Sequence, residues 1–278
     1  MTKKKHVLYR PEFPRSNTYD PNWVMDNQMG PNALWLTEWL CSCMDLKPGM
    51  RVLDLGCGKA VSSIFLAREF GLMVWAMDLW VSADENWKRV CDQNQQDRVF
   101  PVHAEAHALP LAAEFFDAIV SVDAYQYFGT DELYLGYLRR FLRPDGQIGV
   151  VIPGLMQPLG EGIPEHLMRR QSNGHVFWVD ENICFHTAEW WRELWERSNR
   201  VDVLVADAQT DGWRDWRDFE ITLEQVGKNV FPSVAETLDA DRGRYLGFVR
   251  LLGIGKGEVD AFNLYDPDLL AKVESGRV

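Results

Sequence analysis

Two glycines and one carboxylate, placed at the ends of two apolar runs, are the residues of this chain best suited to bind a ligand. Gly56 and Gly58 follow the apolar run 51–55 and precede a helical pattern. Glycines at such a junction let the backbone turn sharply and approach a ligand, and a helix start presents free N–H groups. Asp78 follows a second apolar run, where a carboxylate can accept hydrogen bonds from ribose hydroxyls. The pattern predicts a nucleotide-type site.

The spacing of the glycine turn favours one kind of nucleotide. A dinucleotide-binding turn follows the pattern G-x-G-x-x-G, but its sixth position is occupied here by Val61. Asp54, two residues before Gly56, adds a carboxylate that would repel a pyrophosphate and favour a ligand with positive charge, such as a sulfonium. A nicotinamide-dependent oxidoreductase is therefore a disfavoured alternative.

Short apolar runs alternate with helical patterns from Met50 onward, which is typical of strand–helix–strand units and a mostly parallel sheet. No linker rich in Pro, Gly or Ser separates parts of the chain, so we expect a single domain over residues 1–278. The predicted strands are 51–55, 73–77, 98–104, 117–122, 147–152, 201–206 and 245–253, and the predicted helices are 60–70, 82–95, 131–142, 164–171, 187–197 and a segment from Trp213.

Composition and charge exclude several classes of partner. The 41 Asp and Glu residues outnumber the 29 Lys and Arg residues, and the net charge of −12 is opposite in sign to a nucleic-acid-binding surface. Five cysteines without a CxxC pair or zinc spacing predict a reduced, metal-free, cytoplasmic protein. No apolar stretch has the length of a signal peptide core or a membrane span, so we expect no membrane partner. The sequence leaves the oligomeric state open.

Four motifs in this order resemble those of the class I S-adenosylmethionine-dependent methyltransferases, over about residues 34–152. The stretch DLGCG (54–58) is similar to the first motif of that family, with Ala60 in place of its frequent third glycine. Asp78 matches the acidic end of the second strand. The stretches AEAHALP (104–110), FDAIVSVDAYQYF (116–128) and LRPDGQIGVVI (142–152) are similar to the segments around the third, fourth and fifth strands.

The resemblance implies an α/β fold with a Rossmann-like, doubly wound sheet of seven strands. The implied strand order is 3-2-1-4-5-7-6 with strand 7 antiparallel, a strand that the run 245–253 could supply. It also implies S-adenosyl-L-methionine as the cofactor, bound at the carboxyl ends of the strands beside the first strand.

The resemblance further implies how the cofactor is held. The glycine turn would lie under its methionine part, Asp78 would bind its ribose, and Glu105 with the N–H of Ala106 would contact its adenine. Residues 1–45 are expected to form helices that cover the cofactor, although a helix that only packs against the core is an equally good interpretation of this segment. The predicted cofactor contacts are Met29, Gly30, Asp54, Gly56, Cys57, Gly58, Asp78, Leu79, Trp80, Glu105, Ala106 and Asp123.

The methyl acceptor is expected beside the segment that follows the fourth strand. Tyr125 and Tyr127 there could orient the acceptor or relay its proton, although aromatic packing is an equally good interpretation of either ring. Residues 154–187 are the predicted substrate lid. His186 in this lid is a candidate general base, but a lone histidine is more often structural. Cyclopropane synthases resemble this family but carry Glu-His at the equivalent of Gln126-Tyr127, so their carbocation chemistry is not expected.

The 12 tryptophans allow two interpretations. An aromatic cage would bind an alkylated ammonium group and suit an amine acceptor. The spacing of Trp191 with Trp195 and of Trp213 with Trp216 instead favours packing in the core, which we prefer for most of them.

The sequence therefore predicts an S-adenosylmethionine-dependent methyltransferase that acts on a small molecule at an N, O or C atom. A cofactor-binding module without turnover is the alternative from another class, because no general base is evident.

Overall fold

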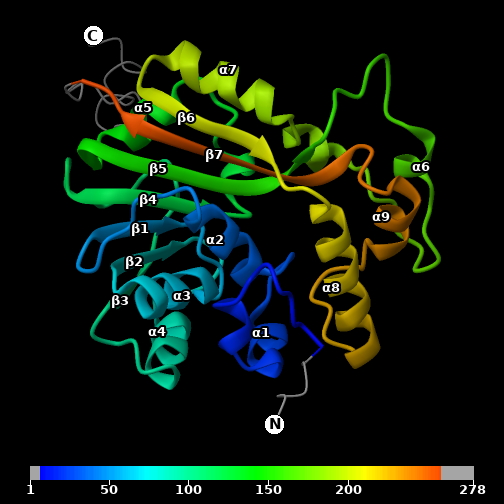
Figure 1. The fold of residues 1–278 in the computed structure, drawn as a ribbon, viewed down its shortest axis with the longest axis horizontal. Helices are drawn as coiled ribbons and strands as arrows, with labels where there is room; N and C mark the ends of the chain where they lie inside the picture. The colour runs from blue at the N-terminus through cyan, green and yellow to red at the C-terminus, as the bar shows by residue number, and fades with distance from the viewer. Residues whose placement is uncertain (1–6, 258–278) are drawn as a thin grey trace, which may run out of the picture.

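A seven-stranded sheet in the order β3-β2-β1-β4-β5-β7-β6 forms the centre of the protein in the computed structural model, which describes residues 7–257 (Figure 1). Neighbouring strands from β3 to β5 pair in parallel, whereas β7 runs antiparallel to both β5 and β6. The predicted strand order and the antiparallel seventh strand are confirmed. The strands are β1 (Arg51–Leu55), β2 (Met73–Asp78), β3 (Val99–His103), β4 (Phe116–Val122), β5 (Leu142–Leu155), β6 (Val201–Ala208) and β7 (Leu246–Gly255).

Helices cover both faces of the sheet. The α-helices are α1 (Pro21–Asn27), α2 (Ala33–Cys41), α3 (Val61–Phe70), α4 (Ala83–Asp92), α5 (Tyr134–Arg139), α6 (Glu165–Met168), α7 (Ala188–Ser198), α8 (Gly212–Val226) and α9 (Ala235–Asp241). Three short 3-10 helices are η1 (Ser16–Thr18), η2 (Tyr125–Tyr127) and η3 (Asp180–Cys184). Within the described residues, no helix combines the length and the apolar content needed to cross a membrane.

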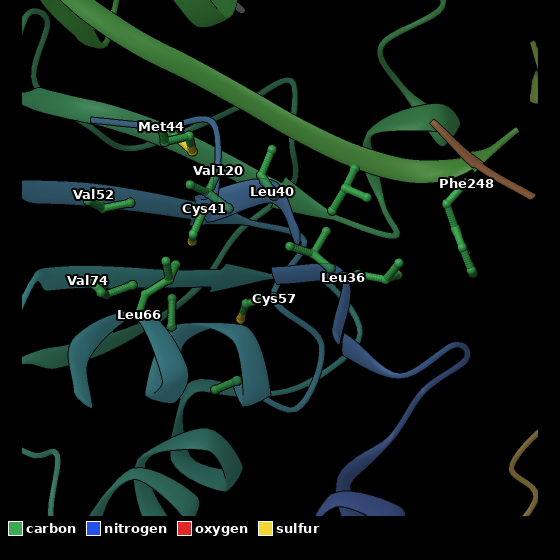
Figure 2. Close-up of a cluster of buried hydrophobic side chains, with 14 of the residues drawn as sticks. Leu36, Leu40, Cys41, Met44, Val52, Cys57, Leu66, Val74, Val120 and Phe248 are labelled. Carbon is green, nitrogen blue, oxygen red and sulfur yellow. The ribbon is translucent and has the colours of Figure 1, made fainter. Parts of the chain in front are cut away.

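The central strands are buried on both sides, which explains why they read as continuous apolar runs rather than alternating ones. Figure 2 shows one face, where Leu36 and Leu40 of α2 and Leu66 of α3 surround Val52 and Val120 of the sheet. The opposite face packs against α5 and α7. The sheet is therefore doubly wound.

The N-terminal segment packs across the molecule onto α8, as Figure 1 shows. Leu34 of α2 and Phe65 of α3 share one buried cluster with Phe219 of α8. The guanidinium of Arg10 adds two ion pairs, to Asp215 at 2.8 Å and to Asp218 at 3.0 Å. A segment from the start of the chain is thus fixed to a helix about 200 residues later.

Two predicted helices are shorter than expected. The helix predicted over 131–142 ends at Arg139, because Leu142 already pairs with Phe116 as the first residue of β5. The helix predicted over 164–171 is reduced to α6, because Arg170 forms an antiparallel bridge with Val176. In both places, pairing with a distant segment replaces the local helical preference.

We expect Ser82→Ala to lower the free energy of unfolding by about 1 kcal/mol, because it removes the N-cap of α4. The Ser82 hydroxyl accepts a hydrogen bond from the Glu85 N–H (3.3 Å), and the Glu85 carboxylate accepts one from the Ser82 N–H (3.2 Å). Urea unfolding would measure the loss. Ser82→Asp keeps an acceptor at the N-cap and serves as the control. An equal loss in both variants would contradict the capping role.

Candidate functional site

The turn between β1 and α3 is held in a shape that only glycine allows at its first position. Gly56 has a φ of +74°, and a Cβ atom added to it would lie 2.3 Å from the Cβ of Ala124. The N–H groups of Gly56 and Cys57 both donate to the Met77 carbonyl, at 2.8 and 3.0 Å. The turn therefore joins the end of β1 to the ends of both β2 and β4.

The Asp78 carboxylate connects this turn to the next one. One oxygen accepts a hydrogen bond from the Gly58 N–H at 2.8 Å. The other oxygen accepts from the N–H groups of Trp80 and Val81, at 2.7 and 2.9 Å. Three backbone donors thus fix the orientation of a carboxylate at the carboxyl end of β2.

These turns line a cavity of about 230 Å³ at the carboxyl ends of the strands, beside β1. This is the edge at which open α/β sheets bind ligands. Ten of the twelve predicted cofactor contacts line it, namely Met29, Gly56, Cys57, Gly58, Asp78, Leu79, Trp80, Glu105, Ala106 and Asp123.

The other two predicted contacts lie directly behind the lining. Asp54 is buried under the glycine turn, where one oxygen accepts hydrogen bonds from the Ser62 and Ser63 hydroxyls, each at 2.6 Å. Its second oxygen has no partner, and burial raises the pKa of this carboxyl to about 6. Gly30 touches a lining residue, since a Cβ atom added to it would lie 2.7 Å from the Asp123 Oδ2.

The segment after β3 is fixed by its own side chains. Glu105 accepts hydrogen bonds from the His107 N–H at 2.8 Å and lies 2.7 Å from the His107 ring nitrogen Nδ1. The Tyr134 hydroxyl donates to the Ala106 carbonyl at 3.0 Å. The predicted adenine contacts therefore sit in a segment that is already ordered.

The N-terminal segment closes one side of the cavity. The Lys59 ammonium donates to the Asp26 carbonyl at 3.3 Å, and Lys228 forms an ion pair with the Asp26 carboxylate at 2.7 Å. The Gln28 amide donates to the Lys228 carbonyl at 2.9 Å. The cover is thus joined both to the glycine turn and to the loop after α8.

Sequence reasoning missed fourteen lining residues. Most of them neighbour a predicted residue along the chain, so a wider window around each motif would have found them. Those of α1 and α2 carry no motif. The missed residues are Val24, Asn27, Gln28, Pro31, Ala33, Leu55, Lys59, Val61, Ser62, Met77, Ala104, Val122, Ala124 and Phe128.

The three predicted catalytic residues occupy different environments. Tyr127 lines the cavity and is 60% exposed. Tyr125 is fully buried in the core, with its ring 5.7 Å from that of Trp191, so its position does not support the predicted contact with an acceptor. His186 is not among the lining residues; its ring stacks on Trp190 at 3.5 Å, and burial lowers its pKa to about 4.

Asp123, at the end of β4, brings a further carboxylate to the lining of the cavity. Its backbone has a φ of +56°, and its contacts with the Gln126 amide are long, at 3.4 Å. The pKa of Asp123 is raised to about 7, mainly by burial; the Gln126 amide opposes the shift, and the charge of Glu220 on α8 adds to it. Sequence reasoning missed Glu220, which no motif marks.

No group of three or more His, Cys, Asp or Glu side chains within residues 7–257 is arranged to hold a metal ion.

Residues 52–146 match a family model described as a methyltransferase domain. Methyltransferase GfsG of Streptomyces halstedii is 29% identical over 138 residues, which cover 47% of this chain and 48% of that protein. The chain therefore spans about half the length of this curated relative.

Solved structures share the fold at low sequence identity. A protein described as a putative sarcosine dimethylglycine methyltransferase from Galdieria sulphuraria superposes with a TM-score of 0.61 at 18% identity, covering 80% of this chain and 86% of that one. The [4+2]-cyclase SpnF superposes with a TM-score of 0.60 at 16% identity, covering 84% and 85%.

We expect Gly56→Ala to lower the free energy of unfolding by about 1–3 kcal/mol more than Gly49→Ala does, because the new Cβ would overlap Ala124. Gly49 is the matched control, since its φ is +85° but nothing lies within 4 Å of an added Cβ. Its substitution should cost about 1–2 kcal/mol, for the left-handed backbone alone. Urea unfolding measures both values. Adding Ala124→Gly should recover the difference, and no recovery would contradict the steric explanation.

We expect Asp123→Asn to make the free energy of unfolding less dependent on pH between about 4 and 7. The pKa of Asp123 is raised in the folded state, to about 7, from an unfolded value of about 3.9. Its contribution to stability is therefore complete below about pH 4 and is lost as the pH rises through about 7. Urea unfolding at pH 5 and pH 8 tests this. Asp145→Asn, at an exposed position, is the control; identical pH dependence in both variants would refute the expectation.

Proposed function

We propose that the chain is a member of the class I S-adenosylmethionine-dependent methyltransferase family and that it transfers a methyl group from S-adenosyl-L-methionine to a small molecule. The observation that carries the proposal is the glycine turn after β1, joined through Asp78 to the turn after β2, at the edge of a cavity. This arrangement presents an ordered glycine backbone and a fixed carboxylate to one ligand.

The lining residues fit this cofactor. Gly56 and Gly58 leave the backbone open beside the cavity, where an added Cβ on Gly58 would lie only 3.1 Å from the Met29 sulfur. The lining contains three carboxylates, those of Asp78, Glu105 and Asp123, but only one ammonium group, that of Lys59. The cavity therefore favours a cation. S-adenosyl-L-methionine, when bound, supplies an electrophilic methyl group on a positively charged sulfur.

We assign the parts of the cofactor to the residues that line the cavity. Asp78 accepts hydrogen bonds from the ribose hydroxyls, because a carboxylate can bind two hydroxyls at once. Trp80 is 72% exposed and lines the cavity, so its ring covers the nucleoside. Glu105 and the Ala106 N–H contact the adenine, and the glycine turn with Met29 holds the methionine part.

Displacement at a sulfonium disperses charge, so a positioned and dry site helps more than strong acids or bases. The segment around Gln28 and Met29 excludes water from one side of the cavity. Tyr127 and Phe128 line the acceptor side, where we place residues 154–187 as the substrate lid. Phe177 and Phe185 of this segment belong to the same buried cluster as Trp216 of α8.

We further propose that the protein acts in the cytoplasm. All five cysteines are free thiols, although Cys41 and Cys43 are only two residues apart. Reduced cysteines are typical of proteins in that compartment.

Two alternative functions can be distinguished from methyl transfer by experiment, namely cofactor binding without turnover and nicotinamide-dependent oxidoreduction. SpnF, described as a cyclase, shares the fold, which supports a module that binds the cofactor without methyl transfer. A nicotinamide-dependent oxidoreductase is opposed by Val61 in the glycine turn and by the antiparallel β7.

Calorimetry and label transfer test these functions in turn. We expect S-adenosylmethionine and S-adenosylhomocysteine, but not NAD, to bind. Methyl-labelled cofactor should then transfer label into a small-molecule extract. Binding of NAD alone would overturn the proposal, and cofactor binding without transfer into any extract would favour the module.

We expect Trp80→Ala to weaken S-adenosylhomocysteine binding by about 1–3 kcal/mol, the usual worth of a base stacked on an aromatic ring. Calorimetry measures this value. Trp87→Ala is the matched control, because Trp87 is 45% exposed on the following helix but does not line the cavity. Equal affinities of the two variants would exclude the stacking role of Trp80.

A further inference from the structure

Two carboxylates without a basic partner are those of Asp123, at the end of β4, and Glu220, on α8. Asp123 lines the cavity and is half-buried, and Glu220 is only 8% exposed. Within residues 7–257, no Lys, Arg or His side chain forms an ion pair with either of them. The Gln126 amide lies 3.4 Å from the Asp123 carboxylate, and the Asn229 amide lies 3.3 Å from that of Glu220. Glu220 also has neutral donors in the side chains of Trp216 and Ser233 and the N–H of Val234.

The two carboxylates act on each other, because the charge of Glu220 is among the causes that raise the pKa of Asp123. The other titratable groups near Asp123 are Tyr127 of η2 and Cys184 of η3, and both are neutral at pH 7. From the N-terminal segment, Gly30 approaches its Oδ2, since a Cβ atom added to Gly30 would lie 2.7 Å away. No positive charge among the described residues therefore acts on Asp123.

One further buried polar atom beside Asp123 lacks a partner. The side-chain oxygen Oε1 of Gln126 is buried without a hydrogen bond. Buried polar atoms in proteins are nearly always paired, so orphaned ones point to a polar ligand. The rings of Tyr127 and Phe128 line the same side, and aromatic rings beside carboxylates suit a cationic nitrogen.

We propose that the methyl acceptor is a primary or secondary amine, and that Asp123 binds it as its ammonium ion and takes up the proton that it must lose. Glu220 is a positioning residue that acts through Asp123, because its charge strengthens the affinity of Asp123 for that proton. This proposal rests on the methyltransferase function proposed above.

The proton and charge balance favours nitrogen over a neutral oxygen acceptor. The ammonium N–H bond breaks, its proton moves to an Asp123 oxygen, and the nitrogen keeps the electron pair. When that pair forms the new N–C bond, the C–S electron pair stays on sulfur, so the positive charge moves from sulfur to nitrogen. With the proton on Asp123, the site holds one positive charge before the transfer, on sulfur, and one after it, on nitrogen, so no charge is created or lost.

The test is binding of three amines and their matched alcohols to the protein saturated with S-adenosylhomocysteine. The pairs are butylamine with butanol, benzylamine with benzyl alcohol, and 2-phenylethylamine with 2-phenylethanol. Calorimetry at pH 7.5 should show at least one amine binding tenfold or more tightly than its alcohol. Equal binding of each pair, or no binding of any amine, would overturn the proposal.

Variants separate the two carboxylates. Asp123→Asn should abolish the preference for amines, and asparagine tolerates the positive φ at this position. Glu220→Gln should keep the preference but move the pH midpoint of amine binding to lower pH, because it removes a charge that holds the proton on Asp123. Glu193→Gln, at an exposed position on α7, is the control and should change neither quantity.

The remaining outcomes are also decisive. An unchanged amine preference in Asp123→Asn would overturn the role of Asp123. A loss of S-adenosylhomocysteine affinity in that variant, with the amine preference kept, would show that Asp123 binds the cofactor instead. If S-adenosylhomocysteine does not bind the unaltered protein, the proposed function fails, and this inference fails with it.

Discussion

The Asp78 carboxylate binds three backbone N–H groups, and the shape of the cavity depends on this set of hydrogen bonds. Hydrogen bonds to a charged acceptor are stronger than neutral ones, at about 1.5–3 kcal/mol each. They fix the turns after β1 and β2 relative to each other before any ligand arrives. A site ordered in advance loses less entropy when a ligand binds, so the hydrogen bonds that fix these turns would also favour binding in the cavity.

Close backbone approach is the second constraint on this edge of the sheet. Gly56 touches Ala124, and Gly30 touches the Asp123 carboxylate, at distances that leave no room for a Cβ atom. Both contacts lie between β1 and β4, where the strand order reverses direction and the helices change faces of the sheet. The glycines keep the floor and the cover of the cavity close together without filling it.

The features that the sequence predicts well are local ones. The first two strand runs, the glycine turn and Asp78 lie within 30 residues of each other, and their spacing indicates parallel strands and a nucleotide site. Tyr125 and His186 could not be assigned in this way, because packing against α7 decides whether their polar atoms reach the cavity. Glu220 lies on α8, nearly a hundred residues after Asp123, and no motif connects them. Tertiary contacts therefore determine the acceptor side, whereas local pattern determines the cofactor side.

Three carboxylates without an ion-pair partner in the described part of the chain, those of Asp54, Asp123 and Glu220, lower the stability of the folded protein. This cost needs an explanation for each of them. A buried ionised group costs free energy unless it is paired, so Asp54, Asp123 and Glu220 are held partly protonated near neutral pH, with a pKa of about 6 for the first and about 7 for the other two. Hydrophobic residues of similar size would fill these positions at lower cost. Asp54 bonds two serine hydroxyls and so has a structural explanation, but Asp123 has only one distant amide. A carboxyl group left so weakly bonded beside a cavity is best explained by a partner that arrives with the ligand.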